Sequence, residues 1–161
     1  MFIKSLIIES KEGLIRRLDF HQGLNLIVDE TPDTNTETGN NVGKTTILRL
    51  IDICLGKEAR TIYISPEDRR VVNEEVKTFL TEKEVVITLI LVSDWTATAK
   101  EVRIRRNFLL RKNSIQEING ENYSNENEFK KKYILYNISN CTNNSNCTKS
   151  YSCKLNNQFF K

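Results

Sequence analysis

The sequence has few of the residues that a catalytic triad, a membrane-spanning segment or a secretory signal needs. Its 161 residues include only one histidine, His21, and no serine, cysteine or acid is arranged around it for triad chemistry. The longest unbroken apolar run is Leu89–Val92, whereas a bilayer is crossed by roughly 20 apolar residues. The first residues mix charge among their apolar positions, which is not typical of a secretory signal. We therefore expect no membrane partner and a cytoplasmic location with reduced thiols.

Acidic residues are absent from the end of the chain. All 21 aspartates and glutamates precede residue 129, and the last 33 residues carry six lysines. The net charge of +3 therefore belongs to this segment and does not indicate a nucleic-acid groove in the rest of the chain. Length and composition predict one folded domain over residues 1–132 and an asparagine-rich, low-complexity, poorly ordered tail over residues 133–161.

The four cysteines do not form a common metal-ligand pattern. Cys54 stands in an apolar helical segment and is expected to be an inert core residue. Cys141, Cys147 and Cys153 recur every six residues, whereas structural zinc sites prefer shorter Cys-x₂₋₄-Cys pairs and a fourth ligand. A zinc site is therefore not expected.

The apolar periodicity predicts an α/β chain. Three strands come first, followed by a largely buried helix, a second helix, an antiparallel hairpin and a tight turn. The corresponding residues are 2–8, 14–20, 24–28, 47–55, a helix beginning at Ser65, 85–92 paired with 102–110, and Asn119-Gly120. The third strand is apolar on both sides at its end, so we expect it in the middle of a layered fold. Gly56 stands where a left-handed residue commonly ends a helix.

The motif that carries chemistry lies between the third strand and the first helix. A polar loop begins at Asp29, and Gly-Lys-Thr then opens the helix. Backbone N–H groups of such a loop point at phosphate oxygens, and the helix dipole adds positive potential. Lys44 would contact the β- and γ-phosphates, and Thr45 would place its hydroxyl on Mg²⁺. The predicted nucleotide-binding residues are Thr38, Gly39, Asn40, Asn41, Val42, Gly43, Lys44, Thr45 and Thr46.

Several segments resemble the head domain of SMC, RecN and RecF proteins and of other double-strand-break-repair-type ATPases of the ABC class. Residues 21–28 resemble the family's Gly-Leu-Asn-Leu-Ile segment, and Asn40 falls on the asparagine of its Gly-Pro-Asn-Gly-x-Gly-Lys-Ser/Thr loop. Residues 102–106 followed by 118–120 look like its Thr-Ile-x-Arg-Arg and Ile-Asn-Gly hairpins. The chain is most similar to bacterial SMC-like proteins that pair this head with a C-terminal domain of unknown function.

This resemblance, which covers about residues 1–130, implies a fold and a function. The fold is the N-terminal lobe of an ABC/SMC-type P-loop ATPase head, with a mixed sheet and an antiparallel β-subdomain. The implied cofactors are ATP and Mg²⁺, and the implied setting is DNA repair or maintenance. The implied partners are the rest of the head, a second head, and DNA. Thr38 and Asn41 depart from the family by replacing loop glycines.

The resemblance also implies that the family's catalytic half lies outside these 161 residues. That half includes the glutamine that senses Mg²⁺, the coiled coil, the Ser-Gly-Gly signature and the Walker B strand that ends in Asp-Glu. No catalytic residue is therefore expected in this chain.

Two alternatives stay open. A GTPase or kinase would show a base-selecting Asn-Lys-x-Asp or a lid, and neither is visible. A non-catalytic interaction module or truncated fragment would show no turnover.

Four further residues each allow a functional and a structural interpretation. Asp94 ends an apolar strand, as a Mg²⁺-binding aspartate does, but Trp95 follows it and the next strand pairs back at once. A hairpin loop is therefore favoured for Asp94. Arg103, Arg105 and Arg106 carry the charge to contact DNA phosphates, but arginines on a strand are more often solvated, which is what we expect here.

Overall fold

The computed structural model describes residues 1–27, 43–65, 68, 70–110 and 113–133. The elements in chain order are β1 (Phe2–Ser10), β2 (Gly13–Asp19), α1 (Lys44–Cys54), η2 (Ala59–Ile62), α2 (Glu74–Glu82), β3 (Val86–Val92), β4 (Glu101–Asn107), β5 (Gln116–Ile118) and β6 (Glu121–Asn122). A further helix occupies residues 126–133. No helix within these ranges has the length and apolar character needed to cross a bilayer. The predicted tail, apart from Tyr133, lies outside the described residues.

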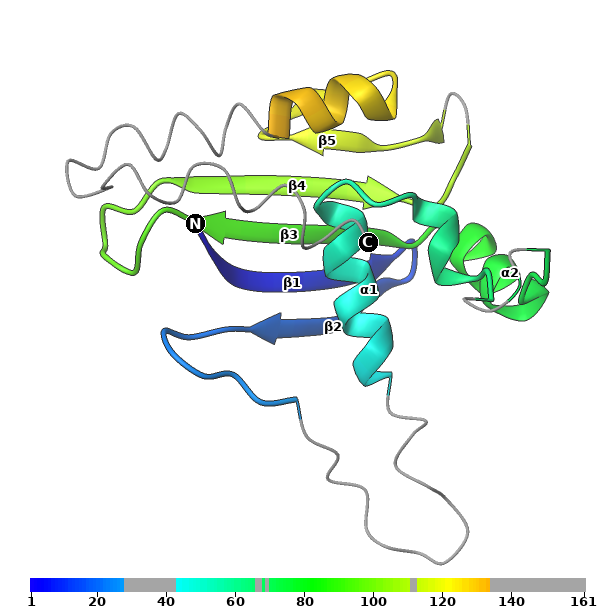
Figure 1. The fold of residues 1–161 in the computed structure, drawn as a ribbon, viewed down its shortest axis with the longest axis horizontal. Coiled ribbons are helices and arrows are strands. Elements are labelled where there is room, and N and C mark those ends of the chain that lie inside the picture. The colour runs from blue at the N-terminus through cyan, green and yellow to red at the C-terminus, as the bar shows by residue number, and fades with distance from the viewer. Residues whose placement is uncertain (28–42, 66–67, 69, 111–112, 134–161) are drawn as a thin grey trace, which may run out of the picture.

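A single six-stranded sheet organises the described part of the chain, with strand order β2-β1-β3-β4-β5-β6 (Figure 1). Every pairing within it is antiparallel. The connection from β2 to β3 carries α1, η2 and α2, so β3 returns beside β1 after all three helices. The predicted α/β class is confirmed, as helices combined with a sheet. The mixed sheet that the resemblance implies is not formed within the described ranges, because each strand there pairs only with antiparallel neighbours.

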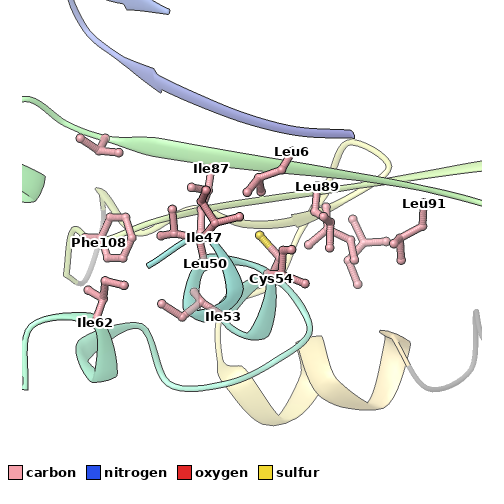
Figure 2. Close-up of a cluster of buried hydrophobic side chains, with 14 of the residues drawn as sticks. Leu6, Ile47, Leu50, Ile53, Cys54, Ile62, Ile87, Leu89, Leu91 and Phe108 are labelled. Carbon is pink, nitrogen blue, oxygen red and sulfur yellow. The ribbon is translucent and has the colours of Figure 1, made fainter. Parts of the chain in front are cut away.

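The core lies between α1 and one face of the sheet. Four residues in register across four strands form its central row and are fully buried: Leu6, Leu89, Ile104 and Ile118. Figure 2 shows Ile47, Leu50, Ile53 and Cys54 of α1 gathered among the sheet side chains of this core. The predicted buried helix is therefore confirmed. Its apolar residues recur at helical spacing, which places them on the face that packs against the sheet.

The predicted antiparallel hairpin and the predicted tight turn are both confirmed. β3 pairs with β4 from Val86 opposite Asn107 to Val92 opposite Glu101. β5 and β6 are joined by Asn119-Gly120, whose φ values of 52° and 89° are both left-handed. Asn-Gly is the dipeptide that favours such a two-residue turn, because both central residues need positive φ.

The predicted third strand is not formed over the part of residues 24–28 that the structure describes. Residues 24–27 belong to no strand. Leu24 and Leu26 are 77% and 73% exposed. An apolar run becomes a buried strand only where neighbouring strands supply hydrogen bonds and packing, and within the described ranges this run has no paired neighbour. The expectation of a central, doubly covered strand is therefore wrong for residues 24–27.

The second helix begins later than the sequence suggests. Asn73 is its N-cap, and the Asn73 side chain accepts a hydrogen bond from the N–H of Val76. The Ser65 hydroxyl instead accepts from Asp68 N–H inside a loop that is closed by a bridge between Ile64 and Val72. Ser65 therefore belongs to this loop and does not cap a helix. Asn is an equally good N-cap, and Asn73 directly precedes Glu74, the first residue of α2.

Candidate phosphate-binding helix

The start of α1 has the local geometry of an open anion-binding helix end. Gly43 is its N-cap, with φ 71° and ψ 17°, and no side chain caps the first turn. No acidic residue stands in that turn. Left-handed backbone is easily adopted by glycine, which explains why Gly43 can turn the chain into the helix here. The first N–H groups of a helix have no intrahelical partners and carry partial positive charge, so such an end suits an anion.

The three residues after Gly43 lie at the open end of α1. Lys44, Thr45 and Thr46 form the first turn of α1. Lys44 is half-buried, whereas Thr45 and Thr46 are exposed. Lys44 and Thr45 therefore sit beside the uncapped end of the helix. The other predicted residues, Thr38, Gly39, Asn40, Asn41 and Val42, lie outside the described residues, so the structure does not bring the complete loop together.

The turn that precedes the loop is organised by one asparagine. The Asn25 side chain accepts from the N–H of His21 at 3.0 Å and donates to the carbonyls of His21 and Gly23 at 2.9 and 3.2 Å. His21 itself is exposed, and its Nδ1 lies 3.0 Å from the carbonyl of Gln22. His21 is therefore part of the turn, and Asn25 is the residue that shapes it.

The opposite end of α1 is closed by Gly56, as the sequence predicts. Gly56 has φ 107°, and its N–H donates to Ile53 O at 3.1 Å. The N–H of Lys57 donates to Asp52 O at 2.9 Å. These two bonds are those of a Schellman motif, which satisfies carbonyls at a helix end.

Sequence reasoning missed the role of Arg106, which is not solvated. Its side chain is 2% exposed and lies at the closed end of α1. One guanidinium nitrogen, Nη1, donates to Ile53 O at 2.8 Å and to Lys57 O at 2.9 Å. The other, Nη2, donates to Glu126 Oε1 at 3.1 Å. A cation at a helix C-terminus is favourable because it faces the negative end of the dipole.

Arg105 and Arg103 stand on the opposite face of the same strand. Arg105 pairs with Glu117 at 3.0 Å and its side chain is 37% exposed. The exposed Arg103 has no ion pair within the described ranges. The expectation of solvated arginines thus holds for Arg103, holds in part for Arg105, and is wrong for Arg106.

Asp94 belongs to the hairpin loop, in agreement with the favoured interpretation. The Thr96 hydroxyl donates to its carboxylate, and the Thr96 N–H does so at 2.8 Å. Ser93 Oγ adds a bond of 3.0 Å. These donors, with the Thr96 hydroxyl first, hold the pKa of Asp94 below its usual range. The carboxylate is thereby committed to shaping the turn from β3 to β4.

No group of metal ligands assembles within the described ranges. No cluster of three or more histidine, cysteine or acidic side chains occurs there. Cys54 is fully buried, and burial raises the pKa of its thiol to about 12, so it stays protonated and unreactive. Cys141, Cys147 and Cys153 lie outside the described residues.

Comparison with known proteins identifies no relative among family models or curated proteins. No protein-family model matches the chain, and no curated protein matches it. The function proposed below is therefore based on the residues of α1 and on the motif in which they stand.

Proposed function

We propose that the chain binds Mg²⁺-ATP through residues 38–46, as part of an SMC-like ATPase head. The observation that carries this proposal is the start of α1, where Lys44 and Thr45 follow a left-handed glycine at an uncapped helix end. In a phosphate-binding loop, Gly-Lys-Thr stands at the N-terminus of a buried helix, where the lysine contacts the terminal phosphates and the threonine binds Mg²⁺. The resemblance of the sequence to SMC-type heads supplies the choice of ATP and the setting in DNA repair or maintenance.

A panel of nucleotides tests the ligand class. We expect Mg²⁺-ATP at about 100 times its dissociation constant to raise the melting temperature by roughly 5–15 °C, because it binds only the folded state. ATP with EDTA should give a smaller shift, and AMP, which lacks the β- and γ-phosphates, should give almost none. Equal shifts with AMP and ATP would contradict a phosphate-loop site. A larger shift with GTP than with ATP would favour the GTPase alternative.

We predict that the bound nucleotide is not turned over at an appreciable rate. Hydrolysis needs a carboxylate that orients the attacking water, and such general-base help contributes about 10²–10⁴-fold. The first turn of α1 has no acid, and the carboxylate of Asp94 is held by its own loop. Phosphate release measured over hours should match a protein-free control. Release that Lys44→Ala abolishes would overturn this prediction.

A second candidate function is a non-catalytic interaction module. It is favoured by the large apolar side chains that the structure leaves open to solvent near the predicted loop. Leu24, Leu26 and Leu48 are 77%, 73% and 57% exposed. The rest of a head or a second head would be the corresponding partner, and the resemblance adds DNA. The absence of any nucleotide-dependent shift in the panel above would favour this candidate over ATP binding.

A further inference from the structure

Arg106 joins three separate elements at one point. It extends from β4, donates to the carbonyl of Ile53 in the last turn of α1 and to that of Lys57 just beyond the helix, and pairs with Glu126 at the start of the helix over residues 126–133. The guanidinium carbon lies 5.1 Å from the centre of the Phe129 ring, which is fully buried. A guanidinium held by several acceptors and an aromatic face has a fixed orientation, because its donors form a rigid planar fork.

A second cation, Lys130, lies at the same junction. Lys130 pairs with Glu126 at 3.7 Å, so this carboxylate lies between two positive charges. The Lys130 stem lies against Gly56, where an added Cβ would come within 3.2 Å of the lysine Cγ. The helix over residues 126–133 is therefore packed directly against the turn that ends α1.

We propose that Arg106 is a positioning residue for the nucleotide site at the other end of α1; this rests on the proposed function. Apolar packing holds α1 on the sheet, and hydrogen bonds to its end add a directional constraint along the helix axis that apolar contacts alone do not supply. The bonds from Arg106 to Ile53 O and Lys57 O fix the position of α1 along that axis. The helix is short and continuous, so fixing its C-terminal end also fixes the first turn that carries Lys44 and Thr45.

The experiment compares Arg106→Lys with Arg105→Lys. Arg106→Lys keeps the charge but loses the fork, whereas Arg105→Lys changes the neighbouring residue, whose side chain pairs with Glu117 on the other sheet face. We expect Arg106→Lys to weaken Mg²⁺-ATP binding roughly 2- to 30-fold, the range for residues that couple to a site without contacting the ligand. Arg105→Lys should bind as the wild type does.

Amide hydrogen exchange separates positioning from a merely structural role. In the wild type, Mg²⁺-ATP should slow exchange in residues 126–133 as well as in α1. In Arg106→Lys that nucleotide-dependent protection of residues 126–133 should be lost. Glu126→Gln keeps Arg106 and leaves it a neutral acceptor, so its affinity for Mg²⁺-ATP and its protection of residues 126–133 should lie between those of the wild type and Arg106→Lys. This variant replaces Arg106→Lys in the experiment if Arg106→Lys does not fold. A folded Arg106→Lys with wild-type affinity and protection would overturn the positioning role alone. A wild type that binds no nucleotide would overturn the proposed function and this role together.

Discussion

Replacing Leu89 with alanine is expected to lower the free energy of unfolding by about 2–5 kcal/mol, as large-to-small changes in a packed core do. Leu89 is fully buried in β3 and lies in register between Leu6 and Ile104. Because α1 covers this row, the truncated side chain would leave a cavity that rigid strands on both sides cannot close. Urea unfolding followed by circular dichroism measures the change.

Leu24→Ala is the matched control, because it makes the same chemical change in a leucine that is 77% exposed. Surface substitutions usually change stability by no more than about 0.5 kcal/mol. The two leucines stand in similar apolar runs of the sequence, so only the structure distinguishes them. If Leu24→Ala destabilised the isolated chain as much as Leu89→Ala, residues 24–27 would be packed and the described exposure would be contradicted.

The elements that the sequence predicts correctly are those with a local cause. The helix of α1 is specified by its own apolar spacing and by Gly56, and the turn at residues 119–120 by Asn-Gly. The hairpin of β3 and β4 follows from two alternating or apolar runs separated by a short polar connection. In each case the determining residues are neighbours in the chain, so no distant contact is needed.

Two wrong predictions concern pairing partners that the local sequence pattern does not specify. The apolar run at residues 24–28 reads as a buried strand, but burial depends on whether other strands lie beside it. The helix predicted from Ser65 begins at Asn73 because the bridge between Ile64 and Val72 turns the chain first. Pairing partners of this kind cannot be read from a single sequence.

Arg106 shows that a signal can be present and still be missed. Val102, Ile104 and Phe108 share its parity on the strand and are buried, whereas Arg103 and Arg105 have the other parity. Strand alternation alone places Arg106 on the apolar face. Its acceptors, the carbonyls of Ile53 and Lys57 and the carboxylate of Glu126, are far away in sequence. Parity could therefore predict that Arg106 is buried, but not what it binds.

At the candidate site, Lys44→Ala has the largest expected effect on nucleotide affinity. The lysine stands in the first turn of α1, where its ammonium group would face the β- and γ-phosphates. A hydrogen bond to a charged group contributes about 1.5–3 kcal/mol, so its loss should weaken Mg²⁺-ATP binding about 10- to 100-fold. The backbone N–H groups at the start of α1 would remain after this change, so weak binding should persist.

Lys57→Ala is the control for charge and fold. Lys57 follows the other end of the same helix and forms an exposed pair with Asp52 at 3.2 Å. Exposed pairs contribute about 0–1 kcal/mol, so this variant should stay folded while losing the same single charge. Its affinity for Mg²⁺-ATP should equal that of the wild type, because its side chain is at the end of α1 away from the predicted phosphates.

The dissociation constant of Mg²⁺-ATP, measured by calorimetry for the wild type, Lys44→Ala and Lys57→Ala, tests the central claim most directly. We predict saturable binding to the wild type, unchanged binding to Lys57→Ala and much weaker binding to Lys44→Ala. Equal dissociation constants for all three proteins, or no binding to any of them, would contradict a phosphate site at the start of α1.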